Sequence, residues 1–94
     1  MSLAPHVTPE EVRANIVEEF YVQPAGLPLV LCVLTLRNGF LVTGTAACAS
    51  FAAFDPDLGR RTARQYAFDQ VWELMGYERR QRLFEEAREA PWDH

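Results

Sequence analysis

The chain has 94 residues, 49% of them hydrophobic, and a formal net charge of −4. This length is enough for one small domain with a modest core, and we expect a single domain over residues 1–94 with loose ends at about 1–7 and 90–94. The acidic balance argues against non-specific nucleic-acid binding. The longest apolar run is far shorter than the about 20 residues that span a bilayer, and no secretion signal is recognisable, which indicates a soluble intracellular protein.

The first predicted element is a short helix that begins after Thr8 and ends near Asn15. Thr8 is a suitable N-cap, Pro9 suits the first helical position, and Glu11 stands three residues on to complete a capping box. From Val17 to Gln23 the residues alternate in polarity and many are β-branched or aromatic, which favours a strand. A connection rich in proline and glycine then leads to the central strand.

The segment Leu29–Cys48 predicts a β-hairpin. Asn38-Gly39 stands between two strand-like runs, and this pair is the preferred sequence of a two-residue type I′ turn. In that register Cys32 lies opposite Thr45. With the preceding strand, the hairpin forms a three-stranded antiparallel meander.

This register has three consequences for the sheet. Cys32 and Cys48 lie on opposite faces, so no disulfide joins them. Gly44 lies opposite Val33 in mid-strand, where a glycine marks the close approach of another part of the chain, or alternatively of a ligand. Both faces of the sheet are apolar, so the second face requires the N-terminal helix, the last helix or a second copy of the chain as a cover.

The longest predicted helix starts at Asp55, a good N-cap before Pro56, and ends at Gly76 in a left-handed cap. Gly59 inside its first turns indicates a close crossing or a local break. A short last helix follows over Glu78–Glu89. The stripe expected against the sheet is Leu58, Ala63, Tyr66, Ala67, Val71 and Leu74, and a second stripe is Phe68, Trp72 and Met75. The predicted fold class is therefore α+β, with a short N-terminal helix, the meander, a long helix and a short C-terminal helix.

The sequence holds no recognisable catalytic or metal motif, and we expect no enzyme activity and no cofactor. Its two histidines, His6 and His94, lie near the ends of the chain, where no rigid scaffold positions them. The two cysteines have no nearby histidine or lysine to activate them and are interpreted as core thiols. A small hydrolase or transferase remains an alternative only through a carboxylate pair such as Asp55 and Asp57.

Two groups of side chains are candidates for binding a partner. All nine basic residues are arginines, and Arg60 and Arg64 share a helix face on which they either bind a carboxylate or phosphate or simply meet solvent. Trp72 and Tyr77 beside Phe68 are either core residues or anchors for a protein partner. The candidate partner-binding residues are therefore Arg60, Arg64, Phe68, Trp72 and Tyr77. The residues assigned structural roles are Asn38, Gly39, Gly44, Asp55, Gly59 and Gly76.

The order of residues between Val30 and Leu83 resembles a known family. It is carried by Leu36, Asn38-Gly39, Gly44, Cys48, Phe54-Asp55, Leu58-Gly59, Ala63, Ala67, Val71-Trp72, Leu74, Gly76-Tyr77 and Leu83. The pattern is similar to a family of small tailed-phage and prophage proteins named after gene products of a coliphage and a Shigella phage. The chain departs from it at residues 50–53, where a more polar loop is expected. The resemblance implies an accessory phage protein of the host bacterial cytoplasm, with no established activity.

The function expected from these observations is non-catalytic binding of a host or phage protein, with a possible homodimer. Small phage proteins of this kind often bind host proteins, which is an argument by association. Two alternatives remain open: nucleic-acid binding through two arginine clusters, and a role as a virion or assembly component. The first cluster is Arg60-Arg61-Arg64 and the second is Arg79-Arg80-Arg82.

Overall fold

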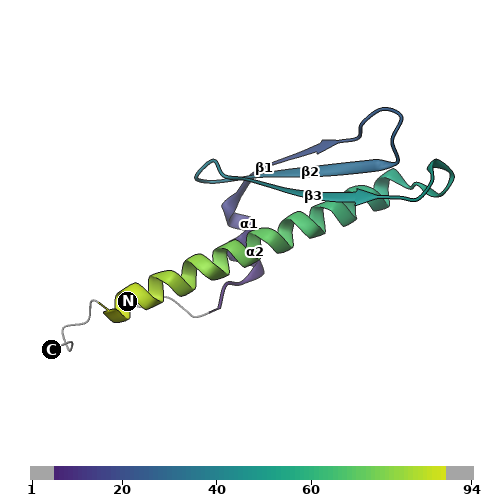
Figure 1. Cartoon of the computed structure of the whole chain (residues 1–94). Helices are drawn as coiled ribbons and strands as arrows, with labels where there is room; N and C mark the ends of the chain where they lie inside the picture. Colours follow the sequence, from purple (N-terminus) through teal and green to yellow (C-terminus); the bar gives the residue numbers. More distant parts are fainter. Residues whose placement is uncertain (1–5, 89–94) are drawn as a thin grey trace.

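A computed structural model describes residues 6–88 and shows an α+β fold (Figure 1). In chain order its elements are α1 (Pro9–Asn15), β1 (Ile16–Val22), β2 (Leu29–Leu36), β3 (Leu41–Ala47), the short 3-10 helix η1 (Phe51–Ala53) and α2 (Pro56–Arg88). The strands form one antiparallel sheet in the order β1-β2-β3. The predicted fold class and the three-stranded meander are confirmed.

The predicted N-terminal helix is present with its capping box. The Glu11 amide donates to Thr8 Oγ1 at 3.2 Å, and the Thr8 amide donates to Glu11 Oε2 at 2.9 Å. β1 begins directly after α1, one residue earlier than predicted. Of the end expected to be loose at residues 1–7, only His6 and Val7 are described, and Val7 is buried. Residues 90–94 lie outside the described residues.

The turn between β2 and β3 is longer than the predicted two-residue type I′ turn. Asn38 keeps a negative φ, whereas Gly39 has a φ of +90°. The Leu36 carbonyl accepts from the Gly39 amide, and the Leu36 amide donates to the Phe40 carbonyl, each at 2.9 Å. This is a three-residue loop that ends in a glycine bulge. The Asn38 side chain accepts from the Phe40 amide at 3.0 Å, which stabilises this arrangement.

The longer turn shifts the hairpin register by one residue from the predicted one. Cys32 pairs with Gly44 and not with Thr45. The predicted reason for keeping the cysteines apart is therefore wrong: alternation along the strand places Cys48, one residue past β3, on the same side as Cys32. The two thiols are separated instead along the strand, by four residues or about 13 Å, and both are free.

Helix α2 packs on β2 and β3 with its backbone close to the sheet. A Cβ atom on Gly44 would overlap the Ala63 carbonyl oxygen and would lie 2.6 Å from the Ala67 amide nitrogen. A Cβ atom on Gly59 would lie 3.0 Å from Val30 Cγ2. The predicted close approach at both glycines is confirmed, and the helix passes through Gly59 without a break.

The buried stripe of α2 is narrower than predicted. It consists of small residues at a spacing of four and of two larger ones: Gly59, Ala63, Ala67, Phe68 and Val71. The predicted stripe members Leu58, Tyr66 and Leu74 are exposed. Side chains of that size under the helix would hold its backbone away from Gly44, so they flank the contact instead. On the sheet side the core is completed by Val30, Cys32, Leu34, Leu36 and Val42.

The predicted break at Gly76 is wrong, because α2 is one continuous helix through Arg88. Gly76 does not have a positive φ and lies within the helix. The chain beyond it has no proline before residue 88 and consists of good helix formers. Two side-chain pairs stabilise these turns: Glu78 with Arg82 at 2.7 Å, and Gln81 with Glu85 at 3.0 Å.

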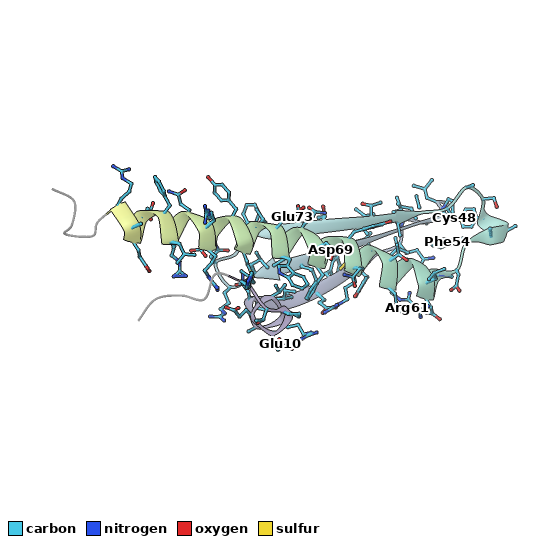
Figure 2. All side chains as sticks on the ribbon, turned by 90° about the horizontal axis from the view of Figure 1, so that it is seen from below. Glu10, Cys48, Phe54, Arg61, Asp69 and Glu73 are labelled. Atoms are coloured by element: carbon cyan, nitrogen blue, oxygen red, sulfur yellow. The ribbon has the colours of Figure 1, made fainter. Side chains whose placement is uncertain are left out.

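The length of α2 gives the molecule its shape. Its 33 residues extend for about 50 Å, whereas strands of seven or eight residues extend for about 25 Å. The C-terminal turns of the helix therefore project beyond the sheet (Figure 2). No helix within residues 6–88 is both long and apolar enough to cross a membrane.

Candidate protein-binding surfaces

The five predicted partner-binding residues all lie on α2, but they do not form one surface. Arg60, Arg64, Phe68 and Trp72 follow one another at a spacing of four residues along one side of the helix. Tyr77 lies about 140° round the helix from Trp72, since each residue turns the helix by about 100°. The structure therefore brings the first four together and separates Tyr77 from them.

Both predicted arginines of the first cluster have acidic partners. Arg60 pairs with Asp57 one turn earlier on the helix, and Arg64 Nε donates to Glu19 Oε2 of β1 at 3.1 Å. The Arg64 guanidinium also lies over the ring of Phe68, 5.5 Å from its centre. Arg64 therefore connects α2 to the first strand.

Phe68 and Trp72 hold the N-terminal segment against α2. Phe68 is buried, and its ring meets Trp72 edge to face with 5.9 Å between ring centres. Trp72 Nε1 donates to the Val7 carbonyl at 3.0 Å. Most of the apolar surface of this pair is used inside the molecule, so the structure favours their interpretation as core residues.

The second arginine cluster adds a further link to the N-terminal segment. Arg79 is buried, with Nη2 donating to Glu11 Oε1 at 2.6 Å and Nη1 donating to the His6 carbonyl at 3.2 Å. The hydrogen bond from the Thr8 amide, followed by the one from Arg79, lowers the pKa of Glu11 below its ordinary value. One carboxylate therefore caps α1 and joins it to α2.

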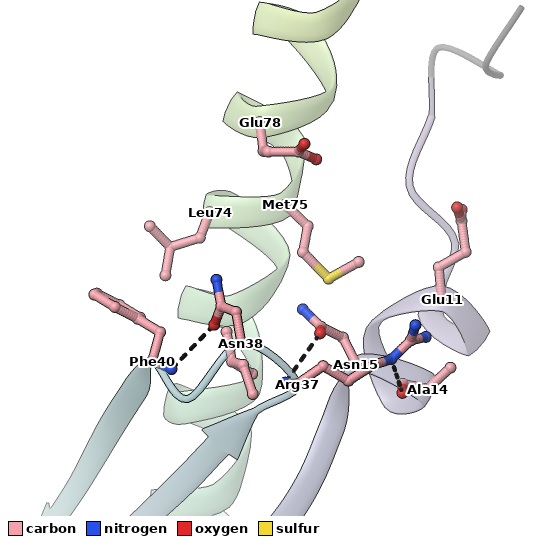
Figure 3. Close-up of a pocket in the computed structure, with 10 residues that line it drawn as sticks. Glu11, Ala14, Asn15, Arg37, Asn38, Phe40, Leu74, Met75 and Glu78 are labelled. Atoms are coloured by element: carbon pink, nitrogen blue, oxygen red, sulfur yellow. Dashed lines mark hydrogen bonds between the residues drawn. The ribbon is translucent and has the colours of Figure 1, made fainter.

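An open cleft of about 560 Å³ lies where the hairpin turn meets α1 and α2 (Figure 3). The Met75 side chain points into it from α2. Its polar groups join the hairpin to α1: the Arg37 amide donates to Asn15 Oδ1 at 3.3 Å, and Arg37 Nε donates to the Ala14 carbonyl at 3.2 Å. The polar groups of the cleft therefore hold the hairpin against α1. Residues 6–88 contain no cluster of three or more metal-ligating side chains in this cleft or elsewhere.

Tyr77 lies on a second hollow, which we call the α2–hairpin groove. The groove has a volume of about 420 Å³ between β3 and α2, and its exposed apolar residues are Phe40, Leu41, Leu74 and Tyr77. Each of the four is more than two-fifths exposed, and Tyr77 is the most exposed at 72%. Glu73 and Gln70 add polar groups to the wall of the groove.

The sheet face turned away from α2, called the outer face, is also apolar. Glu19 points toward α2, where Arg64 binds it, so its neighbours Glu18 and Phe20 point to the outer face. Figure 1 shows α1 and α2 on the same side of the sheet, and within residues 6–88 no element covers the other side. The large apolar members of the outer face include Phe20, Val22, Leu29, Leu31, Val33 and Leu41.

Residues 7–83 match the model of the Phage protein (N4 Gp49/phage Sf6 gene 66) family. The chain belongs to this family. The match confirms the resemblance noted between Val30 and Leu83 and extends it back to Val7, so it includes α1, the whole sheet and most of α2. No curated protein and no solved structure matches the chain.

The sequence-based interpretation of this phage family member missed three residues of the α2–hairpin groove. Leu74 is predicted in the stripe against the sheet but is exposed, and Phe40 and Leu41 lie in a hairpin whose predicted register differs by one residue. The signal available was the spacing of Leu74, Tyr77 and Phe84, which continues an apolar row past the end of the sheet. These three residues form one row only if α2 continues through Gly76 as a single helix.

Proposed function

We propose that this phage protein acts by binding a protein partner through the α2–hairpin groove, without catalysing a reaction, in the cytoplasm of the host bacterium. The observation that carries the proposal is the exposure of Tyr77 beside an apolar hollow formed by two separate elements. Tyrosine is enriched among residues that dominate binding energy, because it buries a large apolar ring and keeps a polar tip. A partner helix or loop that covers the groove would shield four large side chains from water.

The state of the acidic side chains supports a non-catalytic role. Asp55 Oδ1 accepts from the amides of Asp57 and Leu58, at 3.0 and 3.3 Å, and so caps α2. Asp57 pairs with Arg60. The carboxylate pair that a small hydrolase would need is therefore used to begin the helix.

The pairing of the arginines weakens the nucleic-acid alternative. Binding to phosphates requires cationic groups that are free to replace counterions. Arg64, Arg79 and Arg82 each contact a carboxylate of this chain, and the net charge is −4. A role in virion assembly remains compatible with the proposal, since it is also protein binding.

A photo-crosslinking amino acid placed at Tyr77 tests the groove directly. During infection of the natural host, we expect it to attach one protein in high yield, which mass spectrometry then identifies. The matched control is the same amino acid at Phe51, which is 56% exposed near the opposite end of the sheet. Equal products from both positions, or none from Tyr77, would contradict the proposal.

A quantitative test follows once the partner is purified. We expect Tyr77→Ala to weaken binding by about 2 kcal/mol or more, as at an interface anchor. Phe51→Ala should leave the affinity unchanged. Calorimetric titration measures both, and equal affinities for wild type and Tyr77→Ala would exclude Tyr77 as an anchor.

A further inference from the structure

We propose that the outer face of the sheet binds the outer face of a second copy of this chain, in a two-fold dimer whose sheets stack face to face. This inference does not rest on the proposed function, because most of the contact is formed by residues of β1 and β2. Leu41 and Thr43 of β3 belong to the outer face and also line the α2–hairpin groove. Four observations carry it: the protected edges, the distribution of large and small residues, the position of the charge and the size of the face.

Both edges of the sheet are protected against pairing with another strand. β1 has a bulge between Ile16 and Glu18, and it carries two adjacent glutamates, Glu18 and Glu19. On β3, Gln70 Nε2 of α2 donates to the Thr43 carbonyl at 2.7 Å. Bulges, charges and occupied backbone groups are the usual means of blocking edge-to-edge association. The sheet of a second copy can therefore associate with the outer face more readily than with either edge.

The outer face is complementary to itself. Along one row of the sheet, Phe20 of β1 stands beside Val33 of β2, which stands beside Thr43 of β3. The next row repeats the order with Val22, Leu31 and Thr45. In these two rows the side chains of β1 therefore extend further from the sheet than those of β3. A two-fold axis parallel to the strands, between the sheets, places β1 of each copy over β3 of the other. Phe20 then fills the space above Thr43 twice, and Val33 meets Val33 near the axis.

The same axis keeps the one acidic side chain of the outer face at the rim. Glu18 shares a row with Thr35 and Leu41, so each Glu18 stands over Leu41 of the other copy. The two Glu18 carboxylates lie at opposite edges of the stacked sheets. Their separation avoids the like-charge repulsion that a buried pair would cause.

The size of the face is sufficient for a weak to moderate dimer. Three strands of seven or eight residues make a surface about 25 Å long and about 15 Å wide. Two such faces in contact bury on the order of 1,000 Å², at the lower limit of stable interfaces. We therefore expect a dissociation constant in the micromolar range, about 1–100 µM.

Sedimentation equilibrium of the full chain over a range of concentrations tests the dimer. Wild type should pass from monomer to dimer, and Phe20→Lys should weaken the dimer by about tenfold or more, because it places a charge in the apolar contact. Phe51→Lys is the matched control: a phenylalanine of similar exposure, 56% against 61%, outside the face. Circular dichroism checks that each variant is folded. A wild type that stays monomeric, or a dimer that Phe20→Lys leaves unchanged, would overturn the proposal.

A mixing experiment tests the orientation of the two copies. Thr43→Glu should also weaken the dimer when present alone. In a mixture of Phe20→Lys with Thr43→Glu, the proposed axis brings the new ammonium over the new carboxylate at one contact and leaves the other contact native. Recovery of dimer in the mixture supports the stacking of β1 on β3. A mixture that stays as weak as the single variants would overturn it.

Discussion

Gly44 of β3 lies against the backbone of α2 so closely that a Cβ atom on it would stand 2.6 Å from the Ala67 amide nitrogen. This contact sets the height of the helix above the sheet. It explains why the helix buries glycine and alanine at a spacing of four while its larger apolar residues remain exposed. The exposure of Leu58, Tyr66 and Leu74 beside the sheet thus follows from one mid-strand glycine.

Gly44→Ala should destabilise the fold. The added methyl group meets helix backbone, which cannot rotate away as a side chain can, so the helix must shift off the sheet. We expect a loss of about 2–3 kcal/mol in the free energy of unfolding, equivalent to a fall of about 10 °C or more in Tm. Urea unfolding and thermal melting measure the change. An unaltered Tm would show that the helix does not pack at this distance.

Gly76→Ala should have the opposite effect. Gly76 lies inside α2 with open space around its Cα, so a methyl group meets nothing within 4 Å. Alanine is favoured over glycine in a helix by about 1 kcal/mol, and we expect a gain of about 0.5–1 kcal/mol in stability. The measurement also tests the continuity of α2. If Gly76 were a left-handed helix cap, alanine would instead destabilise the protein by about 1 kcal/mol or more.

The two largest errors of sequence-based prediction for this fold both arise at glycines. Gly39 suits both a two-residue and a three-residue turn, and only the pairing of the strands decides between them. The deciding pattern was present: Val42, Gly44 and Ala46 point inward, while Thr43 and Thr45 point outward. Gly76 is compatible with both a helix end and a helix interior. Whether the helix continues past Gly76 is decided by the helix propensity of the residues that follow it.

Helix caps were predicted correctly from local sequence, because a capping side chain accepts hydrogen bonds from backbone amides only two or three residues away. The capping residues Thr8 and Asp55 were predicted and are confirmed, because a cap needs only its own first turn. The docking of Trp72 on Val7 and of Arg79 on Glu11 joins residues more than 60 positions apart. No short-range pattern contains such a contact, so the surfaces that it leaves exposed could not be predicted either.

The Glu11 carboxylate should make stability depend on pH in the acid range. Its pKa is lowered in the folded protein from an ordinary value of 4.5, so the unfolded chain binds its proton more readily. This contribution is therefore fully present above about pH 4.5 and is lost as the pH falls through the folded pKa. We expect Glu11→Gln to lose that part of the acid slope.

Urea midpoints measured from pH 3 to pH 7 test this prediction. Glu10→Gln is the matched control, since Glu10 lies in the same turn and pairs with the exposed Arg13 at 3.5 Å. The control should keep the wild-type slope. Equal slopes for wild type and Glu11→Gln would contradict the link between α1 and Arg79.

The two free cysteines should differ sharply in reactivity with a thiol reagent. Cys32 is fully buried under α2, and burial raises the pKa of its thiol, so the reactive thiolate is both scarce and shielded. Cys48 is partly exposed beyond β3. In the native protein we expect one rapidly modified thiol and one that reacts only when the molecule unfolds, with two rapid thiols in denaturant.

Cys48→Ser should remove the rapid phase, whereas Cys32→Ser should retain it. Two rapid phases in the native protein would mean that α2 leaves the sheet readily, contrary to the close contact at Gly44.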